Sequence, residues 1–146
     1  MLILIKEKLF HIFERIVALI DGFNVTEVAI EAPFYGKNVQ SMLKLGRAQG
    51  VAIAAAMQSG LSITEYSPKK VKQSITGNGN ADKQQVMLML QQILNFKESP
   101  KHMDATDALA VALCHLFQQK TNTDLSTAKS NGWKDFLTKN PGRLKK

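Results

Sequence analysis

The sequence predicts an α/β fold, because short apolar runs typical of buried strands alternate with longer segments whose apolar residues recur every three or four positions. The clearest strand covers residues 28–31, where an apolar run ends in the carboxylate of Glu31 shortly before Pro33. Residues 61–66 form a second predicted strand. With 146 residues and 45% hydrophobic content, the chain can bury one sizeable core. We therefore expect a parallel sheet packed against apolar helices.

Periodicity and capping residues place the helices. They are predicted over residues 9–20, 39–58 and 103–117, with two more that begin near residues 68 and 83. Asn38 is a favourable N-cap for the second helix, and Ser67 with Pro68 gives an N-cap followed by proline at the first helical position. The second helix carries a stretch of small residues: Gly46, Gly50, Ala52 and Ala54 to Ala56. They favour close contact with an internal neighbour, or, as a second interpretation, with another copy of the chain.

Three acidic residues are candidates for a site. Glu31 ends a strand, and sites in open α/β sheets gather beyond the carboxyl ends of strands, although a solvated acid is an equally simple interpretation. Asp104 and Asp107 are three residues apart and so share one face of a helix's first turn. Helix capping is the alternative for Asp104. If this face meets the end of the strand, three carboxylates would converge around a hard cation such as magnesium or manganese.

The formal net charge of +7 favours a polyanionic partner, although excess lysine is also an ordinary solubility feature. Lys72 lies in a basic segment, and Lys83 lies in the first turn of a helix, where a cation is unfavourable unless it serves a bound phosphate. Phe34, Lys37 and Asn38 combine an aromatic, a cation and an amide, which suits contact with a nucleic acid. Packing is the alternative for Phe34.

Other features exclude several classes of protein. Cys114 lies beside Leu113 on an apolar helix, so we expect a core residue in a reducing, cytoplasmic setting. The apolar opening is broken at Lys6, which makes it too short for a signal peptide or a membrane span, and no membrane partner is expected. No GxxxxGK loop, GxSxG elbow or cysteine-histidine cluster occurs, and the three histidines are scattered. We assign residues 1–119 to one domain and 120–146 to a polar, basic tail.

From about residue 9 to residue 119 the chain resembles the bacterial crossover (Holliday) junction endonucleases of the RuvC type, which have a ribonuclease-H-like, three-layer fold. The order and spacing of several short motifs carry this resemblance. They are Ala29-Ile30-Glu31 with Phe34 and Lys37-Asn38, Leu43-Lys44-Leu45-Gly46, Val71-Lys72-Gln73, Gly77 to Gly79 with Lys83, and Asp104-Ala105-Thr106-Asp107-Ala108-Leu109-Ala110.

The resemblance implies a function for these residues. Glu31, Asp104 and Asp107 would be active-site carboxylates that hold two Mg²⁺ ions, with Mn²⁺ as a substitute. Phe34 would lie near the junction, and Lys72 and Lys83 would contact DNA. The reaction would be hydrolysis of a phosphodiester by metal-activated water. Members of the family act as homodimers on four-way junctions in recombination and repair, together with a branch-migration helicase complex.

One part of the family pattern does not occur here. The family's first strand carries an aspartate in an Ile-Asp-Pro-Gly motif, and this sequence contains no such motif. The resemblance therefore predicts that the family's first three strands and one of four carboxylates lie outside this sequence, and that the chain as written is inactive and poorly stable alone. Two alternatives to a nuclease follow: a DNA-binding or dimerising remnant without catalysis, and a metal-independent helical scaffold whose acids are only caps.

Overall fold

The computed structural model describes residues 2–33, 38–97 and 103–127, with side chains for residues 5–33, 38–97 and 103–119. The elements in chain order are α1 Leu2–Phe23, β1 Glu27–Glu31, α2 Val39–Gln58, β2 Ser62–Tyr66, α3 Pro68–Thr76, α4 Lys83–Leu94 and α5 Met103–Thr127. The chain forms two compact units, residues 1–115 and residues 116–146. The fold and the site below belong to the first unit.

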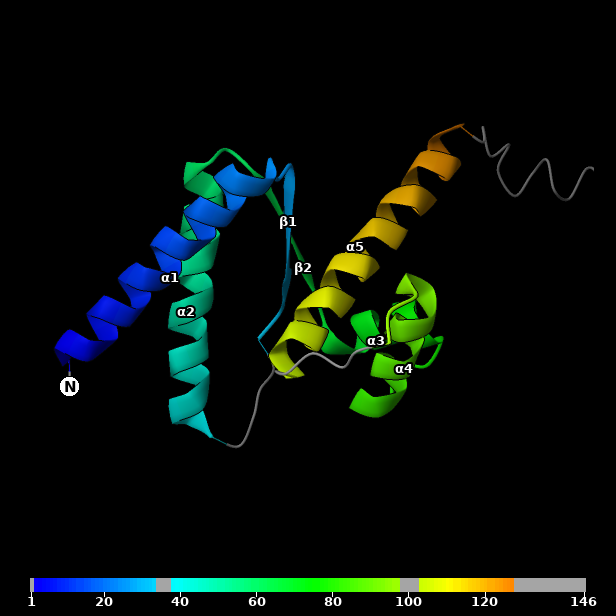
Figure 1. Cartoon of the computed structure of the whole chain (residues 1–146), viewed down its shortest axis with the longest axis horizontal. Helices are drawn as coiled ribbons and strands as arrows, with labels where there is room; N and C mark the ends of the chain where they lie inside the picture. Colours follow the sequence, from blue (N-terminus) through cyan, green and yellow to red (C-terminus); the bar gives the residue numbers. More distant parts are fainter. Residues whose placement is uncertain (1, 34–37, 98–102, 128–146) are drawn as a thin grey trace, which may run out of the picture. The chain divides into compact units, whose positions relative to one another are not determined.

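The two strands are parallel and pair along their full length, from Glu27 opposite Ser62 to Glu31 opposite Tyr66. Helix α2 connects them. Figure 1 shows β1 and β2 between α1 and α2 on one side and the first turns of α5 on the other. Within the described ranges, β1 has β2 as its one neighbour in the sheet. The predicted α/β class and both predicted strands are therefore confirmed.

Helix starts follow the predicted capping residues. The Asn38 side chain accepts a hydrogen bond from the Ser41 N–H at 3.1 Å, and the Ser67 hydroxyl accepts one from the Lys70 N–H at 3.2 Å. These bonds satisfy backbone donors that have no partner inside the helix. Helix α3 ends at Thr76 and is followed by the C-cap Gly77, whose φ of +75° lies in the left-handed region that glycine adopts without strain. Local sequence thus fixes where α2 and α3 begin.

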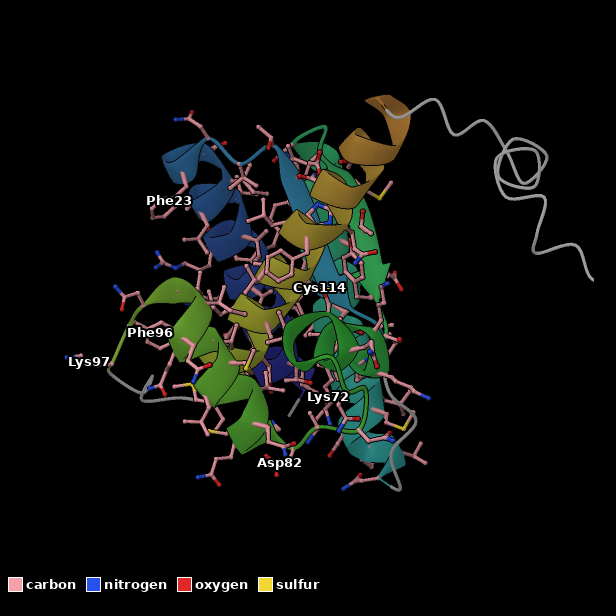
Figure 2. The ribbon with its side chains drawn as sticks, turned by 90° about the vertical axis from the view of Figure 1, so that its right-hand side faces the viewer. Phe23, Lys72, Asp82, Phe96, Lys97 and Cys114 are labelled. Carbon is pink, nitrogen blue, oxygen red and sulfur yellow. The ribbon has the colours of Figure 1, made fainter. Side chains whose placement is uncertain are left out.

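The core lies where the apolar faces of the helices meet the sheet. Its buried apolar residues are Ile20, Ala55, Ala56, Tyr66, Val71, Ile75, Ala81, Val86, Leu90, Ala110, Val111, Leu113 and Cys114. Leu90 and Cys114 are fully enclosed, and Figure 2 shows Cys114 on α5 among the side chains of this core. The expectation of a buried free thiol is confirmed.

Three features differ from the sequence expectations. Helix α1 begins at Leu2 instead of near residue 9, because no helix-breaking residue separates the apolar opening from the amphipathic segment. Helix α5 continues to Thr127, beyond the polar change near Gln118. The expected internal contact of the small-residue stretch is confirmed at Ala55 and Ala56, which are fully buried. It is wrong for Gly46 and Gly50, which are exposed and where an added methyl group would meet no atom within 4 Å.

None of the described helices is both long enough and apolar enough to cross a lipid bilayer. Phe34 and Lys37, two of the residues assigned to DNA contact, lie outside the described residues, as does most of the segment assigned to the tail. The assignment of residues 1–119 and 120–146 to a domain and a tail stays a prediction.

Candidate active site

A pocket of about 420 Å³ opens at the carboxyl end of β1. Its walls come from β1, α3, α4 and α5, and the residues that line it are Glu31, Pro68, Val71, Lys72, Lys83, Val86 and Asp107. Two acids and two lysines therefore share a pocket whose remaining walls are apolar. Four of the residues singled out from the sequence are brought together here: Glu31, Lys72, Lys83 and Asp107.

Glu31 is held by its backbone on two sides. The Gln49 side chain on α2 donates a hydrogen bond to the Glu31 carbonyl at 2.6 Å. The N–H of the next residue, Ala32, donates to the Tyr66 carbonyl at 2.8 Å, which extends the pairing of β1 with β2 by one residue. The end of β1 is thus bonded to both α2 and β2. These bonds fix the backbone position from which the half-buried Glu31 side chain extends.

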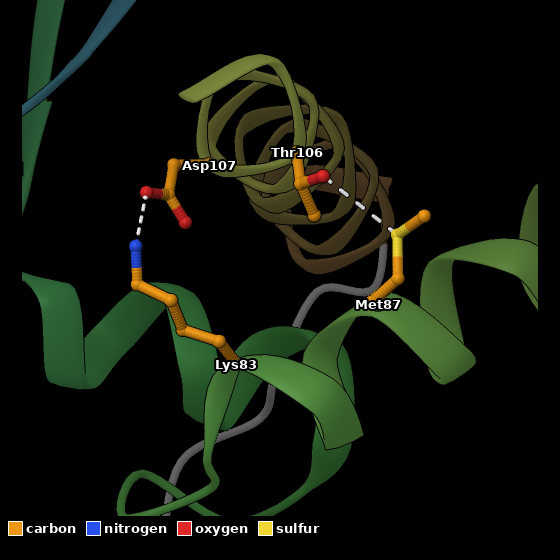
Figure 3. Close-up of polar contacts among 4 residues, drawn as sticks. All are labelled: Lys83, Met87, Thr106 and Asp107. Atoms are coloured by element: carbon orange, nitrogen blue, oxygen red, sulfur yellow. Dashed lines mark hydrogen bonds and ion pairs between the residues drawn. The ribbon is translucent and has the colours of Figure 1, made fainter. Parts of the chain in front are cut away.

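Asp107 faces the pocket from α5 and has a cationic partner. The Lys83 ammonium group donates to Asp107 Oδ2 at 2.9 Å, with both side chains partly exposed. One turn further along α4, Met87 Sδ receives a weak hydrogen bond from the buried Thr106 hydroxyl at 3.7 Å. Figure 3 shows these two contacts side by side between α4 and α5. Together they fix the first turn of α5 against α4.

The sequence interpretation of Lys83 needs correction. Lys83 is the first residue of α4, but the Asp82 side chain caps this helix and accepts from the Gln85 N–H at 2.8 Å, while the Gln85 side chain returns the bond to the Asp82 N–H. This capping box already occupies backbone donors that a phosphate was expected to use. The positive charge of Lys83 interacts unfavourably with the positive end of the α4 dipole, and the ion pair with Asp107 offsets this interaction.

Asp104 behaves differently from the other two acids. It is exposed in the first turn of α5 and does not line the pocket. Its charge nevertheless acts on the site, because Asp104 and Glu31 add to the effect of Asp107 on Lys83. Among the described side chains, no three acidic, histidine or cysteine groups lie close enough to hold one metal ion. The described structure thus brings Glu31 and Asp107 into one pocket, and Asp104 is not among the residues that line it.

The protonation of the site reflects this crowding of charge. The pKa of Glu31 is raised above 4.5, first by burial and then by the negative charge of Asp107, while Lys83 and Lys72 oppose the rise. The pKa of Lys83 is raised above 10.5, mainly by its hydrogen bond and charge interaction with Asp107. Lys83 is therefore a stable cation at neutral pH. The ionised form of Glu31 is the costly one, and any further cation at the pocket would lower that cost.

The donor set fits a hard divalent cation. Carboxylate oxygens are the ligands that Mg²⁺ and Mn²⁺ prefer, and Mg²⁺ commonly binds through one or two carboxylates plus substrate phosphates and water. Glu31 and Asp107 supply two such groups at one pocket, and the repulsion between them is what a cation would relieve. The chemistry of the residues is thus suited to metal-assisted attack on a phosphate.

Sequence patterns give little indication of several residues whose hydrogen bonds join the strands to α2 and α5. Gln49 belongs to no motif, and His115 is one of three scattered histidines. In the structure, His115 bonds both Tyr66 and Glu27. The sequence partly indicates the position of Tyr66. This residue ends β2 as Glu31 ends β1, and the carboxyl ends of neighbouring parallel strands lie at the same edge of a sheet. Nothing local in the sequence pointed to the other three residues.

The chain is similar in sequence to proteins of a known family. Residues 4–115 match the profile of the family described as "Crossover junction endodeoxyribonuclease RuvC". A protein of that name from Cytophaga hutchinsonii is 59% identical over 138 residues, which covers 94% of this chain and 67% of the relative. Another from Bacteroides fragilis is 55% identical over 140 residues, covering 94% of this chain and 73% of the relative.

Solved structures of similar fold agree with the sequence relatives. "T. thermophilus RuvC in complex with Holliday junction substrate" superimposes with a TM-score of 0.76 and 36% identity, covering 81% of this chain and 72% of that one. "Thermus thermophilus RuvC structure" gives a TM-score of 0.75 and 35% identity, covering 82% and 72%. Sequence and structure therefore lead to the same group of proteins.

Proposed function

Because this chain belongs to the crossover junction endodeoxyribonuclease RuvC family, we propose that it is an endonuclease that resolves four-way DNA junctions by metal-dependent hydrolysis of phosphodiester bonds. Its ribonuclease-H-like α/β fold is that of the family. The observation that carries the proposal is the pocket in which Glu31 and Asp107 lie with Lys72 and Lys83. The names of the relatives also favour an enzyme over a DNA-binding remnant.

Membership of this family implies a divalent metal ion, and we propose two Mg²⁺ ions, with Mn²⁺ able to replace them. Glu31 and Asp107 would hold metal in the pocket, and Asp104 would complete the carboxylate set from the first turn of α5. When bound, the metal would supply an activated water and stabilise the leaving oxygen. The alternative is that Asp104 only caps α5, and the effect of its mutation on cleavage would distinguish this role from metal binding.

The lysines have a distinct part in this proposal. Lys83 forms an ion pair with Asp107, which raises the pKa of the lysine. The Lys83 ammonium group is therefore positively charged at neutral pH and lies beside the acids. Lys72 lines the same pocket from α3. Both would bind backbone phosphates and bring the scissile bond to the carboxylates. Phe34, Lys37 and Asn38 would contact DNA from the segment after β1, although the Asn38 side chain also caps α2.

A homodimer is part of the proposal, and α2 offers the surface for it. Val39, Leu43, Gly46, Gly50 and Met57 recur at intervals of three, four and seven residues, which places them on one face of the helix, and all are exposed. A stripe of apolar and small residues at this spacing is the pattern by which helices pair closely. The open space at both glycines would let a second helix approach.

Two broader assignments follow from the family. We propose that the enzyme works with a branch-migration helicase complex, which would deliver junctions to it. We also place it in the cytoplasm, where a reducing environment suits its buried free thiol at Cys114.

The test is cleavage of a synthetic four-way junction by the native gene product, with and without Mg²⁺, beside a linear duplex of the same sequence. We expect paired cuts in the junction that require metal, and little cutting of the duplex. Binding of the junction without any metal-dependent cleavage would instead favour the non-catalytic remnant. Equal binding of junction and duplex, without cleavage, would leave only a general DNA-binding protein.

A further inference from the structure

A chain of hydrogen bonds connects three elements of the fold beside the active-site pocket. The Tyr66 hydroxyl on β2 lies 2.8 Å from His115 Nδ1 on α5, and His115 Nε2 lies 2.7 Å from Glu27 Oε2 on β1. The rings of Tyr66 and His115 also meet edge to face, with centroids 5.7 Å apart. No residue of this chain of bonds lines the pocket.

The same elements carry the pocket's acids. Glu27 and Glu31 are four residues apart on β1, and side chains at even spacing in a strand project to the same face of the sheet. Tyr66 is the register partner of Glu31 and projects to that face as well. On α5, Asp107 and His115 are separated by eight residues, or about 12 Å along the helix. One end of each bond therefore lies on the sheet that presents Glu31, and the other lies on the helix that presents Asp107.

The donors and acceptors are mutually consistent. Tyr66 is almost fully buried, and burial, followed by the influence of Cys114 and Glu27, raises its pKa above 10.0. Its hydroxyl is therefore protonated at neutral pH and can donate to His115 Nδ1. With its proton on Nε2, the His115 ring accepts from Tyr66 at Nδ1 and donates to the Glu27 carboxylate. A single tautomer thus satisfies both bonds at once.

Hydrogen bonds fix the position of a helix along and around its axis more closely than apolar packing alone does. Apolar contacts tolerate a small sliding or rotation of a helix, whereas hydrogen bonds weaken steeply once distance and angle change. The contacts of Lys83 and Thr106 tie α5 to α4 but do not reach the sheet. A shift of α5 by one residue, about 1.5 Å along its axis, would break the bonds of His115 and move Asp107 relative to Glu31.

We propose that Tyr66, His115 and Glu27 are positioning residues, whose hydrogen-bond chain fixes α5 on the sheet and sets the separation of Glu31 and Asp107 that metal binding requires. This inference rests on the proposed function of the pocket. Groups bonded directly to metal ligands commonly change metal affinity by about 10- to 100-fold when they are lost, and residues that act through the fold should lie at the lower end of that range. The role is thus distinct from that of a ligand or a base.

The main test is Tyr66→Phe, which removes the hydroxyl and keeps the ring. Binding of Mn²⁺ to the native gene product without DNA, followed by the electron paramagnetic resonance signal of free Mn²⁺, should weaken by about 10-fold. Junction binding without metal should stay unchanged, and cleavage should recover when the metal concentration is raised. Wild-type Mn²⁺ affinity in Tyr66→Phe would overturn the proposal.

Glu27 provides a second test that does not disturb the buried tyrosine. Glu27→Gln keeps an oxygen that can accept from His115 and should retain Mn²⁺ affinity close to wild type, whereas Glu27→Ala should match Tyr66→Phe. Glu65→Gln is the matched control, because it removes an exposed carboxylate from the neighbouring strand without touching this chain of bonds. Equal affinities in Glu27→Ala and Glu65→Gln would overturn the role of Glu27.

A general loss of stability has to be separated from positioning. Ile20→Ala removes buried apolar contacts from α1, a helix that contributes no residue to the hydrogen-bond chain, and serves as a control for destabilisation. If Ile20→Ala weakens Mn²⁺ binding as much as Tyr66→Phe at a similar melting temperature, the role of Tyr66 is only structural and the proposal fails. A wild-type protein that neither binds Mn²⁺ nor cuts junctions would instead overturn the proposed function.

Discussion

Lys83 on α4 donates from its ammonium group to Oδ2 of Asp107 on α5 at 2.9 Å, so the pocket contains its own counter-ion at one of its two acids. The pair is partly exposed, and such pairs contribute only about 0.2–1 kcal/mol to stability. Its importance is therefore in the charge balance of the pocket. The positive charge of Lys83 offsets the negative charge of Asp107, which otherwise raises the pKa of Glu31.

The carboxylates should be essential for cleavage. Glu31→Gln, Asp104→Asn and Asp107→Asn each remove the charge of a proposed metal ligand with little change in volume. We expect each to reduce Mg²⁺-dependent junction cleavage to the level of the metal-free reaction while junction binding stays nearly intact, as measured by gel shift. Glu65→Gln is the control for loss of an exposed acid. Near wild-type cutting by Asp104→Asn would return Asp104 to the role of a helix cap.

The lysines should act through phosphates. Lys72→Ala or Lys83→Ala should weaken binding to junctions of any sequence and lower the slope of log affinity against log salt by about one unit. Lys97→Ala is the matched control, because Lys97 is exposed after α4 and Figure 2 shows it well separated from Lys72. A slope equal to wild type in both pocket variants would mean that these lysines are ordinary solvated residues.

Stability in the absence of metal should depend on the charge of Glu31. Its folded pKa is raised, so the folded state holds a proton more readily than the unfolded state, and ionised Glu31 opposes folding at neutral pH. Glu31→Gln should therefore raise the melting temperature at neutral pH in the presence of EDTA. The gain should shrink as the pH falls through the folded pKa, which lies above 4.5. An unchanged or lower melting temperature at neutral pH would contradict this.

Dimerisation should depend on the exposed stripe of α2. Gly50→Leu places a large side chain where a methyl group now meets open space, so the isolated fold should tolerate it while a second helix could not approach. Sedimentation should then show monomers. Gly22→Leu, at an open glycine of α1, is the control and should stay dimeric. A folded dimer of Gly50→Leu would place the interface elsewhere.

Much of the fold was predictable because its signals are local. The strand that ends at Glu31, the cap at Asn38 and the proline start after Ser67 each depend on residues within a few positions. The boundaries were less predictable, since α1 and α5 both extend further than the apolar pattern indicates. A helix end depends on where breakers and tertiary contacts stop it, and periodicity alone does not specify that.

By itself, the sequence determined the residue types of the site: acids at the end of a strand and the start of a helix, in a basic chain with a buried thiol. Only the tertiary structure decided which of them meet. Lys83 and Asp107 are 24 residues apart, and His115 reaches Tyr66 and Glu27 across 49 and 88 residues. Such contacts form because the apolar faces of helices and sheet pack in one arrangement, and local patterns show that a face exists without showing what it packs against.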